Sequence, residues 1–264
     1  MAQINIAFVL SGFLVGSLVG FTGVGGGSLM TPILIVLFGV HPLAAVGTDL
    51  LFAAVTKTAG ARVHALRGNV DWQVVGLLAL GSVPGALGTI FVMARLPVHS
   101  PALAHAITVA IGVALLLAAA GLLFGRTAGR VAAHSAANRS APAARRGLTV
   151  FLGFLLGVLV SLTSVGAGAV GIVVLRLLYP QLPAVRLVGS DIAHAVPLAL
   201  LAGSGHWLIG DVRWALLGSL LIGSIPGIIL ASRCAHRVPE RILRRGLGMV
   251  LLVIATPILM SQPH

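Results

Sequence analysis

The sequence is dominated by long apolar runs, and charged residues stand almost only between those runs. Charged residues make up 8% of the 264 residues, against about 25% in soluble domains. One helical span of a bilayer takes about 20 apolar residues. The runs are continuous rather than alternating in polarity, which excludes a transmembrane β-barrel. We therefore expect an all-α polytopic membrane protein, with apolar runs at 4–39, 43–61, 72–94, 103–124, 148–179, 187–203, 214–231 and 246–260.

The net charge of +12 arises from 17 basic and 5 acidic residues. The basic residues cluster in short loops between apolar runs, which is how a polytopic membrane protein sets its orientation. We therefore expect the protein to be embedded in a lipid bilayer and not to bind nucleic acid. The single cysteine, Cys234, excludes an internal disulfide and a CxxC motif. We expect no cleavable signal peptide, because the first residues lack a basic region.

The two halves of the sequence match one another when residue numbers are shifted by 141 or 142. Chance similarity in apolar sequence does not easily align aspartate, histidine, tryptophan and proline. The matched pairs include Gly12 with Gly153, Thr22 with Thr163, Asp49 with Asp191, His64 with His206, Trp72 with Trp214 and Pro84 with Pro226. We expect a first transmembrane repeat in residues 1–125, a basic cytoplasmic linker in 126–147 and a second repeat in 148–264.

The first run of each repeat is too long for one span and too short for two full spans. A glycine-rich stretch interrupts each of them, and consecutive glycines favour a break in a helix. Broken backbone at membrane depth occurs only where protein or a water-filled cavity satisfies its polar groups. Each broken segment is therefore either a re-entrant hairpin or two short spans, with three further transmembrane helices in the repeat.

The positions of the arginines predict how the two repeats are oriented. If each broken segment crossed once, the two most basic loops would lie on opposite sides, against the positive-inside rule. If each segment enters and returns, the repeats are inverted and 14 of the 17 basic residues fall on one side. We expect inverted repeats in the cell inner membrane, with both termini outside and loops 62–71, 126–146, 180–186 and 232–245 cytoplasmic.

Inverted repeats with broken helices are typical of secondary transporters, whose substrate sites lie near the bilayer midplane. The N-terminus of a half-helix presents free N–H groups and binds anions. The alternative is that the glycines serve close helix packing, and the sequence does not decide between the two. The candidate substrate-binding residues are Thr22, Gly25, Gly26, Gly27 and Ser28 in the first break and Thr163, Ser164, Gly166 and Gly168 in the second.

Asp49, Asp191 and Lys57 stand well inside apolar runs, whereas Arg176 lies at the edge of one. Asp49 and Asp191 are matched by the repeat, and a carboxylate in a membrane segment is a candidate for proton or substrate coupling. The alternative is a helix cap within Gly-Thr/Ser-Asp. Lys57, the only lysine, lies about two helical turns after Asp49 and so shares its face. It would bind an anion or pair with an aspartate, or else extend to the interface beside Arg62.

His64 and His206 are also matched, and histidine can move protons near neutral pH. The alternative is hydrogen bonding at the interface. No histidine spacing fits a metal site, and no P-loop or GxSxG motif is present. We therefore expect no metal, no cofactor and no enzymatic activity.

The ordered motifs of the chain resemble the sulfite exporter TauE/SafE family. The resemblance rests on Gly23-Val24-Gly25-Gly26-Gly27 with Pro32, Val46-Gly47-Thr48-Asp49-Leu50, His64, Gly68-Asn69-Val70-Asp71-Trp72 and Gly81-Ser82-Val83-Pro84-Gly85. It implies a secondary membrane transporter that exports small anions such as sulfite, sulfoacetate or related organosulfur anions. Coupling of this export to protons is a hypothesis that rests on the intramembrane aspartates. A passive anion channel of the same architecture is the alternative, and a homodimer is compatible with the sequence.

The second glycine-rich break departs from the first in two respects. Ala167 replaces Gly26, and no proline matches Pro32. We therefore expect the two halves to contribute unequally to any site.

Overall fold

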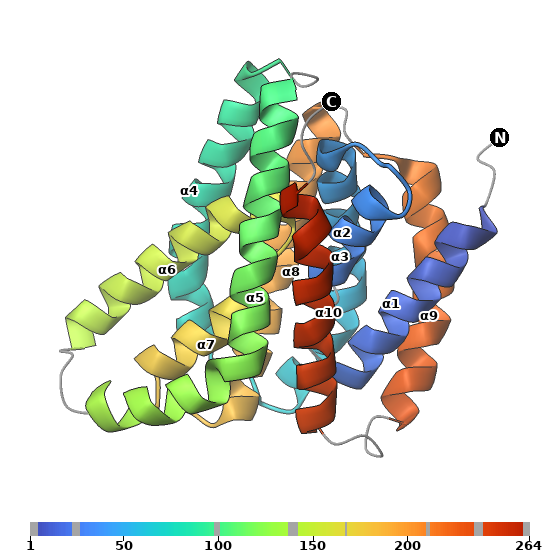
Figure 1. Cartoon of the computed structure of the whole chain (residues 1–264). Coiled ribbons are helices and arrows are strands. Elements are labelled where there is room, and N and C mark those ends of the chain that lie inside the picture. The colour runs from blue at the N-terminus through green and yellow to red at the C-terminus, as the bar shows by residue number, and fades with distance from the viewer. Residues whose placement is uncertain are drawn as a thin grey trace.

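The computed structural model describes residues 5–22, 27–97, 101–136, 142–166, 168–209, 212–234 and 240–260, and these form ten helices without a strand (Figure 1). Five of the described helices are long and apolar enough to cross a membrane. Together these features confirm the all-α polytopic class. The helices are α1 (Ile6–Thr22), α2 (Gly27–Val36), α3 (Pro42–Leu66), α4 (Trp72–Arg95), α5 (Pro101–Ala136), α6 (Pro142–Thr163), α7 (Ala169–Leu178), α8 (Ala184–Ile209), α9 (Trp214–Cys234) and α10 (Glu240–Met260).

The first run of each half divides into two helices. Residues 4–39 contain α1 and α2, and residues 148–179 contain α7 and all of α6 except its first turns, since α6 begins at Pro142. The second helix of each pair has 10 residues, which is about 15 Å of helix and half of the hydrocarbon core. Figure 1 shows α2 leading back toward the end from which α1 starts, and α7 leading back toward the end from which α6 starts.

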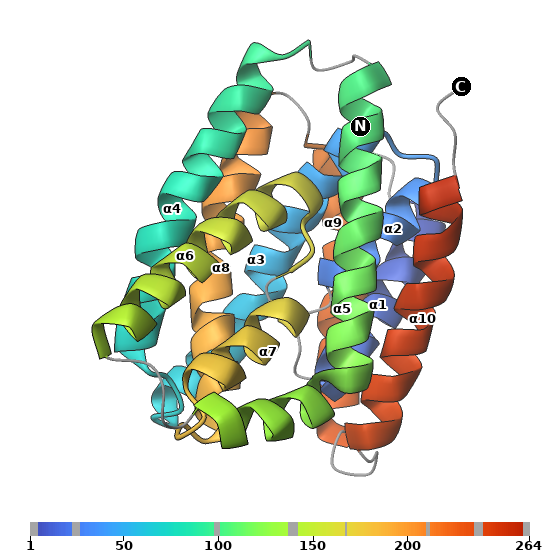
Figure 2. The ribbon, with the colours of Figure 1, turned by 60° about the vertical axis from the view of Figure 1, so that its left-hand side comes forward.

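The helices of the two halves are interleaved. The first helix of one half packs on the fourth helix of the other, so that α1 contacts α9 and α6 contacts α4. The third helices pack on each other as α3 and α8, and the last ones as α5 and α10. Figure 2 shows α5 and α10 side by side and α4 beside α6. The contact of α1 with α9 thus corresponds to that of α6 with α4. The pairs α3–α8 and α5–α10 each join two equivalent helices.

Glycines bring these helix pairs into backbone contact. A Cβ atom at Gly81 of α4 would overlap the carbonyl oxygen of Val150 in α6. A Cβ at Gly223 of α9 would in the same way overlap the carbonyl oxygen of Val9 in α1. The two contacts correspond under the shifts of 142 and 141 that match the halves. Close packing is therefore what these two matched glycines provide.

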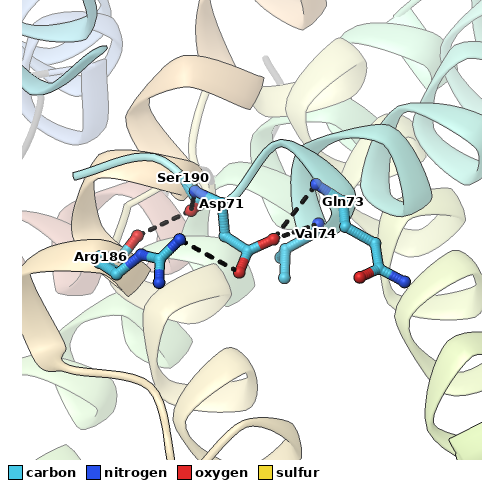
Figure 3. Close-up of polar contacts among 5 residues, drawn as sticks. All are labelled: Asp71, Gln73, Val74, Arg186 and Ser190. Carbon is cyan, nitrogen blue, oxygen red and sulfur yellow. Dashed lines mark hydrogen bonds and ion pairs between the residues drawn. The ribbon is translucent and has the colours of Figure 1, made fainter. Parts of the chain in front are cut away.

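The Gly-Thr/Ser-Asp sequences fasten each half to the other through their hydroxyl groups. The backbone N–H of Asp71 donates to Ser190 Oγ at 2.8 Å, and that of Arg213 donates to Thr48 Oγ1 at 3.2 Å. The two bonds are equivalent under the shift of 142. Figure 3 shows the first of them, where the Asp71 carboxylate also caps α4 and lies 3.8 Å from Arg186. The hydroxyls thus provide the structural contact, and the neighbouring aspartates are left for another role.

The segment expected to link the halves is helical over part of its length. α5 continues to Ala136 and α6 begins at Pro142, so the described helices extend into residues 126–147 from both sides. Alanine and arginine are strong helix formers, which explains helix in a polar segment. The outer surface of the bundle is apolar, with Leu10, Leu80 and Phe91 more than half exposed, as expected of side chains that face lipid.

Candidate functional site

Asp49 lies inside α3 with no exposed surface. Its Oδ2 atom accepts two hydrogen bonds from Thr31 of α2, from the backbone N–H at 3.1 Å and from Oγ1 at 2.6 Å. The other oxygen, Oδ1, has no hydrogen-bond partner among the described residues. Because α2 begins at Gly27, the carboxylate lies by the N-terminal half of this half-helix, where negative charge is favoured.

Asp191 lies at the matched position of α8 and is equally buried, with 1% of its surface exposed. Its Oδ1 atom is so close to Gly171 in the first turn of α7 that a Cβ there would displace the carboxylate. Neither carboxylate oxygen has a hydrogen-bond partner among the described residues. The sequence of α7 contains no hydroxyl-bearing residue, so this half-helix offers Asp191 no counterpart of the Thr31 hydroxyl.

Lys57 carries the positive charge of this cluster. Its side chain is 7% exposed, so it is buried rather than extended to the surface. It interacts electrostatically with both Asp191 and Asp49. When all three groups are ionised, the cluster of Asp49, Lys57 and Asp191 carries a net charge of −1. A buried ion cluster of this kind is costly unless its members pair, which makes it a functional candidate in a membrane segment.

A cavity of about 260 Å³ gives Lys57 access to the end of α3. Lys57, Thr56 and His64 line it from α3, Ile192 from α8 and Ser232 from α9. Most of the exposed wall of this cavity is apolar. The cavity therefore connects the buried cation with the end of the bundle where α3 leads into α4.

The second break lies beside the Asp49 carboxylate. Ser164 is buried, has a positive φ of 57° and is an electrostatic neighbour of Asp49. Positive φ is rare outside glycine, and Gly166 and Gly168 follow with φ of 131° and 124°. Thr163 Oγ1 bonds within the break itself, accepting from the N–H of Val165 at 3.1 Å. The glycine-rich break of the second half thus lies beside Asp49 of the first half.

The two matched histidines have different surroundings. His206 is buried, and its Nε2 lies 2.9 Å from the carbonyl oxygen of Ser161 in the last turn of α6. His64 lines the cavity and packs against Gly189. His194, one turn after Asp191, is buried with its Nε2 at 2.8 Å from Ser82 Oγ of α4. His194 and Ser82 therefore join the Asp191 side of the cluster.

The structure brings four of the sequence candidates together, namely Asp49, Lys57, Ser164 and Asp191. Thr31 and Ser82 are not among the site residues that the sequence predicts. Ser82 belongs there only to the motif Gly81-Ser82-Val83-Pro84-Gly85 of the family resemblance. Among the described residues, no group of three or more His, Cys, Asp and Glu side chains could hold a metal ion. Gly25 and Gly26 lie outside the described residues, and the structure describes only the backbone of Thr22, Gly27 and Ser28.

Replacing Thr31 with valine is expected to destabilise the protein by about 1.5–3 kcal/mol, the range for a hydrogen bond to a charged group. Valine keeps the shape of threonine but leaves Asp49 Oδ2 with the backbone bond alone. Thr58→Val in the same bundle is the control, because the Thr58 hydroxyl bonds only to Ala54 O of its own helix. Thermal unfolding in detergent measures both variants, and equal midpoints would contradict the assigned role of Thr31.

Comparison with known proteins gives a consistent result. The family model described as "Sulfite exporter TauE/SafE" matches residues 8–257. The probable membrane transporter protein YjnA of Bacillus subtilis is 34% identical over 253 residues, which cover 94% of this chain and 97% of that protein. YdhB of the same organism is 28% identical, covering 90% and 94%. A probable membrane transporter protein of Xylella fastidiosa is 27% identical, covering 96% and 94%. No solved structure matches.

Proposed function

The chain belongs to the sulfite exporter TauE/SafE family of membrane proteins, and from this premise we propose that it is a secondary transporter that exports small anions. The anions are sulfite, sulfoacetate or a related organosulfur anion. The observation that carries the proposal is Lys57, a buried cation that lines a cavity and interacts electrostatically with two buried carboxylates. A cation inside a membrane segment is by default a candidate for the pathway of an anion.

The anion would bind between Lys57 and the starts of the half-helices α2 and α7. Half-helix N-termini present N–H groups to anionic substrate in carriers of this architecture. Ser164, Gly166 and Gly168 would border this space from the second break. Gly25 and Gly26, which the sequence predicts as substrate-binding residues of the first break, lie outside the described residues. Asp49 and Asp191 would couple the anion to protons, with His64 and His206 as further proton-carrying groups. No cofactor is needed for this process.

We also propose that the two halves are inverted repeats. The hairpins α1–α2 and α6–α7 start from opposite ends of the bundle in Figure 1. The reciprocal contacts α1–α9 and α6–α4, and the equivalent hydrogen bonds to Thr48 and Ser190, support a two-fold relation between them. In such carriers one repeat or bundle rocks against the other around a fixed site. Because α1 packs on α9 and α6 packs on α4, each of these pairs would then move as one unit.

The same arrangement predicts that both termini lie outside the inner membrane. Arg67 lies in the α3–α4 loop and Arg186 in the first turn of α8. Figure 1 shows this loop and the start of α8 at the end of the bundle opposite the start of α1 and the end of α10. Basic loops remain in the cytoplasm. Alkaline phosphatase fused to the C-terminus should therefore be active in cells, and the same enzyme inserted within residues 126–146 should be inactive. The reverse pattern would contradict the orientation.

Uptake of labelled sulfite and sulfoacetate into proteoliposomes, with and without a pH gradient, tests the transport proposal. We expect saturable flux that follows the imposed gradient. Protein-free vesicles are the control for leak of the protonated anion. Flux that rises linearly with concentration and ignores the gradient would contradict a coupled carrier and favour a passive channel.

A further inference from the structure

Resting on the proposed anion site, we propose that the Asp191 carboxylate occupies the place of the substrate anion in the empty carrier and leaves it by accepting a proton from solvent. The substrate anion then takes over the contacts with Lys57 and the first turn of α7. Asp191 would thus act as an attached competitor of the substrate, and each monoanion would be carried together with one proton.

The first observation that supports this proposal is the position of Asp191. Its Oδ1 atom lies against Gly171 in the first turn of α7, where the positive end of the helix dipole favours an anion. Lys57 acts on the same carboxylate from α3. A helix N-terminus and a buried cation are two elements that suit an anion site. The protein's own carboxylate lies against the first and interacts electrostatically with the second.

The second observation that supports the proposal is the difference between the two aspartates. Asp49 accepts two hydrogen bonds from Thr31, whereas neither oxygen of the buried Asp191 has a partner among the described residues. A buried charge without hydrogen bonds is costly, so Asp191 has less to lose by becoming neutral than Asp49. The matched aspartates therefore take separate roles, with Asp49 holding α2 and Asp191 exchanging the proton.

The charge of the cluster sets the stoichiometry. Asp49, Lys57 and Asp191 sum to −1 when all are ionised. A bound monoanion alone would make the buried site −2, at a high electrostatic cost. A monoanion together with a proton on Asp191 returns the site to −1, so the loaded and the empty site carry the same charge. Flux of a monoanion should then be indifferent to membrane voltage.

The groups that face Asp191 are compatible with this exchange. From α3 it meets Lys57, with Asp49 beyond it, and from its own helix His194, which is held by Ser82 of α4. The charged residues of the other neighbouring helices lie away from this level. Arg176 is in the last turn of α7, Arg145 and Arg146 are in the first turn of α6, and Asp71 and Arg95 are at the two ends of α4.

The test uses the purified full-length protein in detergent with methanesulfonate as the probe, because a sulfonate does not itself titrate near neutral pH. Calorimetry measures binding, and a pH electrode in weakly buffered solution measures proton uptake. For the wild type we expect about one proton taken up for each anion bound. Asp191→Asn should bind the anion more tightly and take up none. Asp71→Asn changes a carboxylate that caps α4 and lies outside the cluster, so this control variant should keep the proton uptake.

Lys57→Gln supplies a second variant that needs no change at either aspartate, and we expect it to lose methanesulfonate binding. Anion binding by the wild type without proton uptake would overturn the inference and leave the carrier proposal standing. Proton uptake that persists in Asp191→Asn would overturn it as well. If neither the wild type nor Asp191→Asn binds methanesulfonate or sulfoacetate, the anion site itself is wrong and both proposals fall.

Discussion

Lys57→Gln is expected to abolish saturable anion flux, with Vmax/KM reduced at least about 30-fold. Removing one partner of a buried charge pair costs about 2 kcal/mol or more, and each 1.36 kcal/mol corresponds to a factor of ten. Lys57 is the buried cation that lines the cavity, and it also offsets the charge of Asp191 and Asp49. Glutamine keeps much of the length and the hydrogen-bonding end of lysine, so the loss reports the charge.

Arg62→Gln is the matched control for this substitution. Arg62 lies further along α3 and its side chain is exposed, so removing its charge should leave flux within about twofold, as surface substitutions usually do. Proteoliposome uptake under identical gradients compares the two variants. Equal activity of Lys57→Gln and Arg62→Gln would contradict the role of Lys57, provided that Lys57→Gln elutes as folded protein in size-exclusion chromatography.

Gly81→Ala and Gly223→Ala are each expected to destabilise the protein by about 3 kcal/mol or more, at or beyond the upper end of the usual range for overpacking. The added Cβ would meet a backbone carbonyl oxygen, of Val150 and of Val9 respectively. A carbonyl cannot rotate away as a side chain can, so α4 must separate from α6, or α9 from α1. Thermal unfolding in detergent should show a lower midpoint for both variants.

The same two helices provide controls. A Cβ atom added at Gly76 of α4 or at Gly218 of α9 would have no other atom within 4 Å, and alanine is the better helix former. Gly76→Ala and Gly218→Ala should therefore be neutral or slightly stabilising. Because Gly81 and Gly223 hold equivalent contacts, the two destabilising variants should also agree with each other. Tolerance of one and not the other would contradict the equivalence of the two helix pairs.

The helices follow from the sequence because the bilayer leaves few alternatives. Continuous apolar runs must form helices in lipid, and the glycine-rich stretch at Gly166 and Gly168 does end α6 and separate it from α7. The end of α5 could not be placed in this way. It continues to Ala136, beyond the apolar run, because helix formation there depends on alanine and arginine rather than on hydropathy.

The site could be predicted in its charged members and in Ser164 of the second glycine-rich break. Asp49, Asp191 and Lys57 stand out because charge is rare in an apolar run, and the spacing places Asp49 and Lys57 on one face of α3. Thr31 and Ser82 do not stand out, because hydroxyl residues are common in membrane helices and usually bond to their own backbone. Their roles depend on which helices pack together. The packing of α2 on α3 and of α4 on α8 cannot be predicted from the local sequence pattern.

Counterflow of labelled sulfoacetate tests the central claim, that a single anion site alternates between the two sides of the membrane, most directly. Proteoliposomes are loaded with unlabelled sulfoacetate and diluted into a trace of labelled anion without any imposed gradient of protons. A carrier exchanges internal for external anion, so we expect a transient accumulation of label that Lys57→Gln does not show. Label that merely equilibrates, at the same rate with and without internal sulfoacetate, would contradict a carrier.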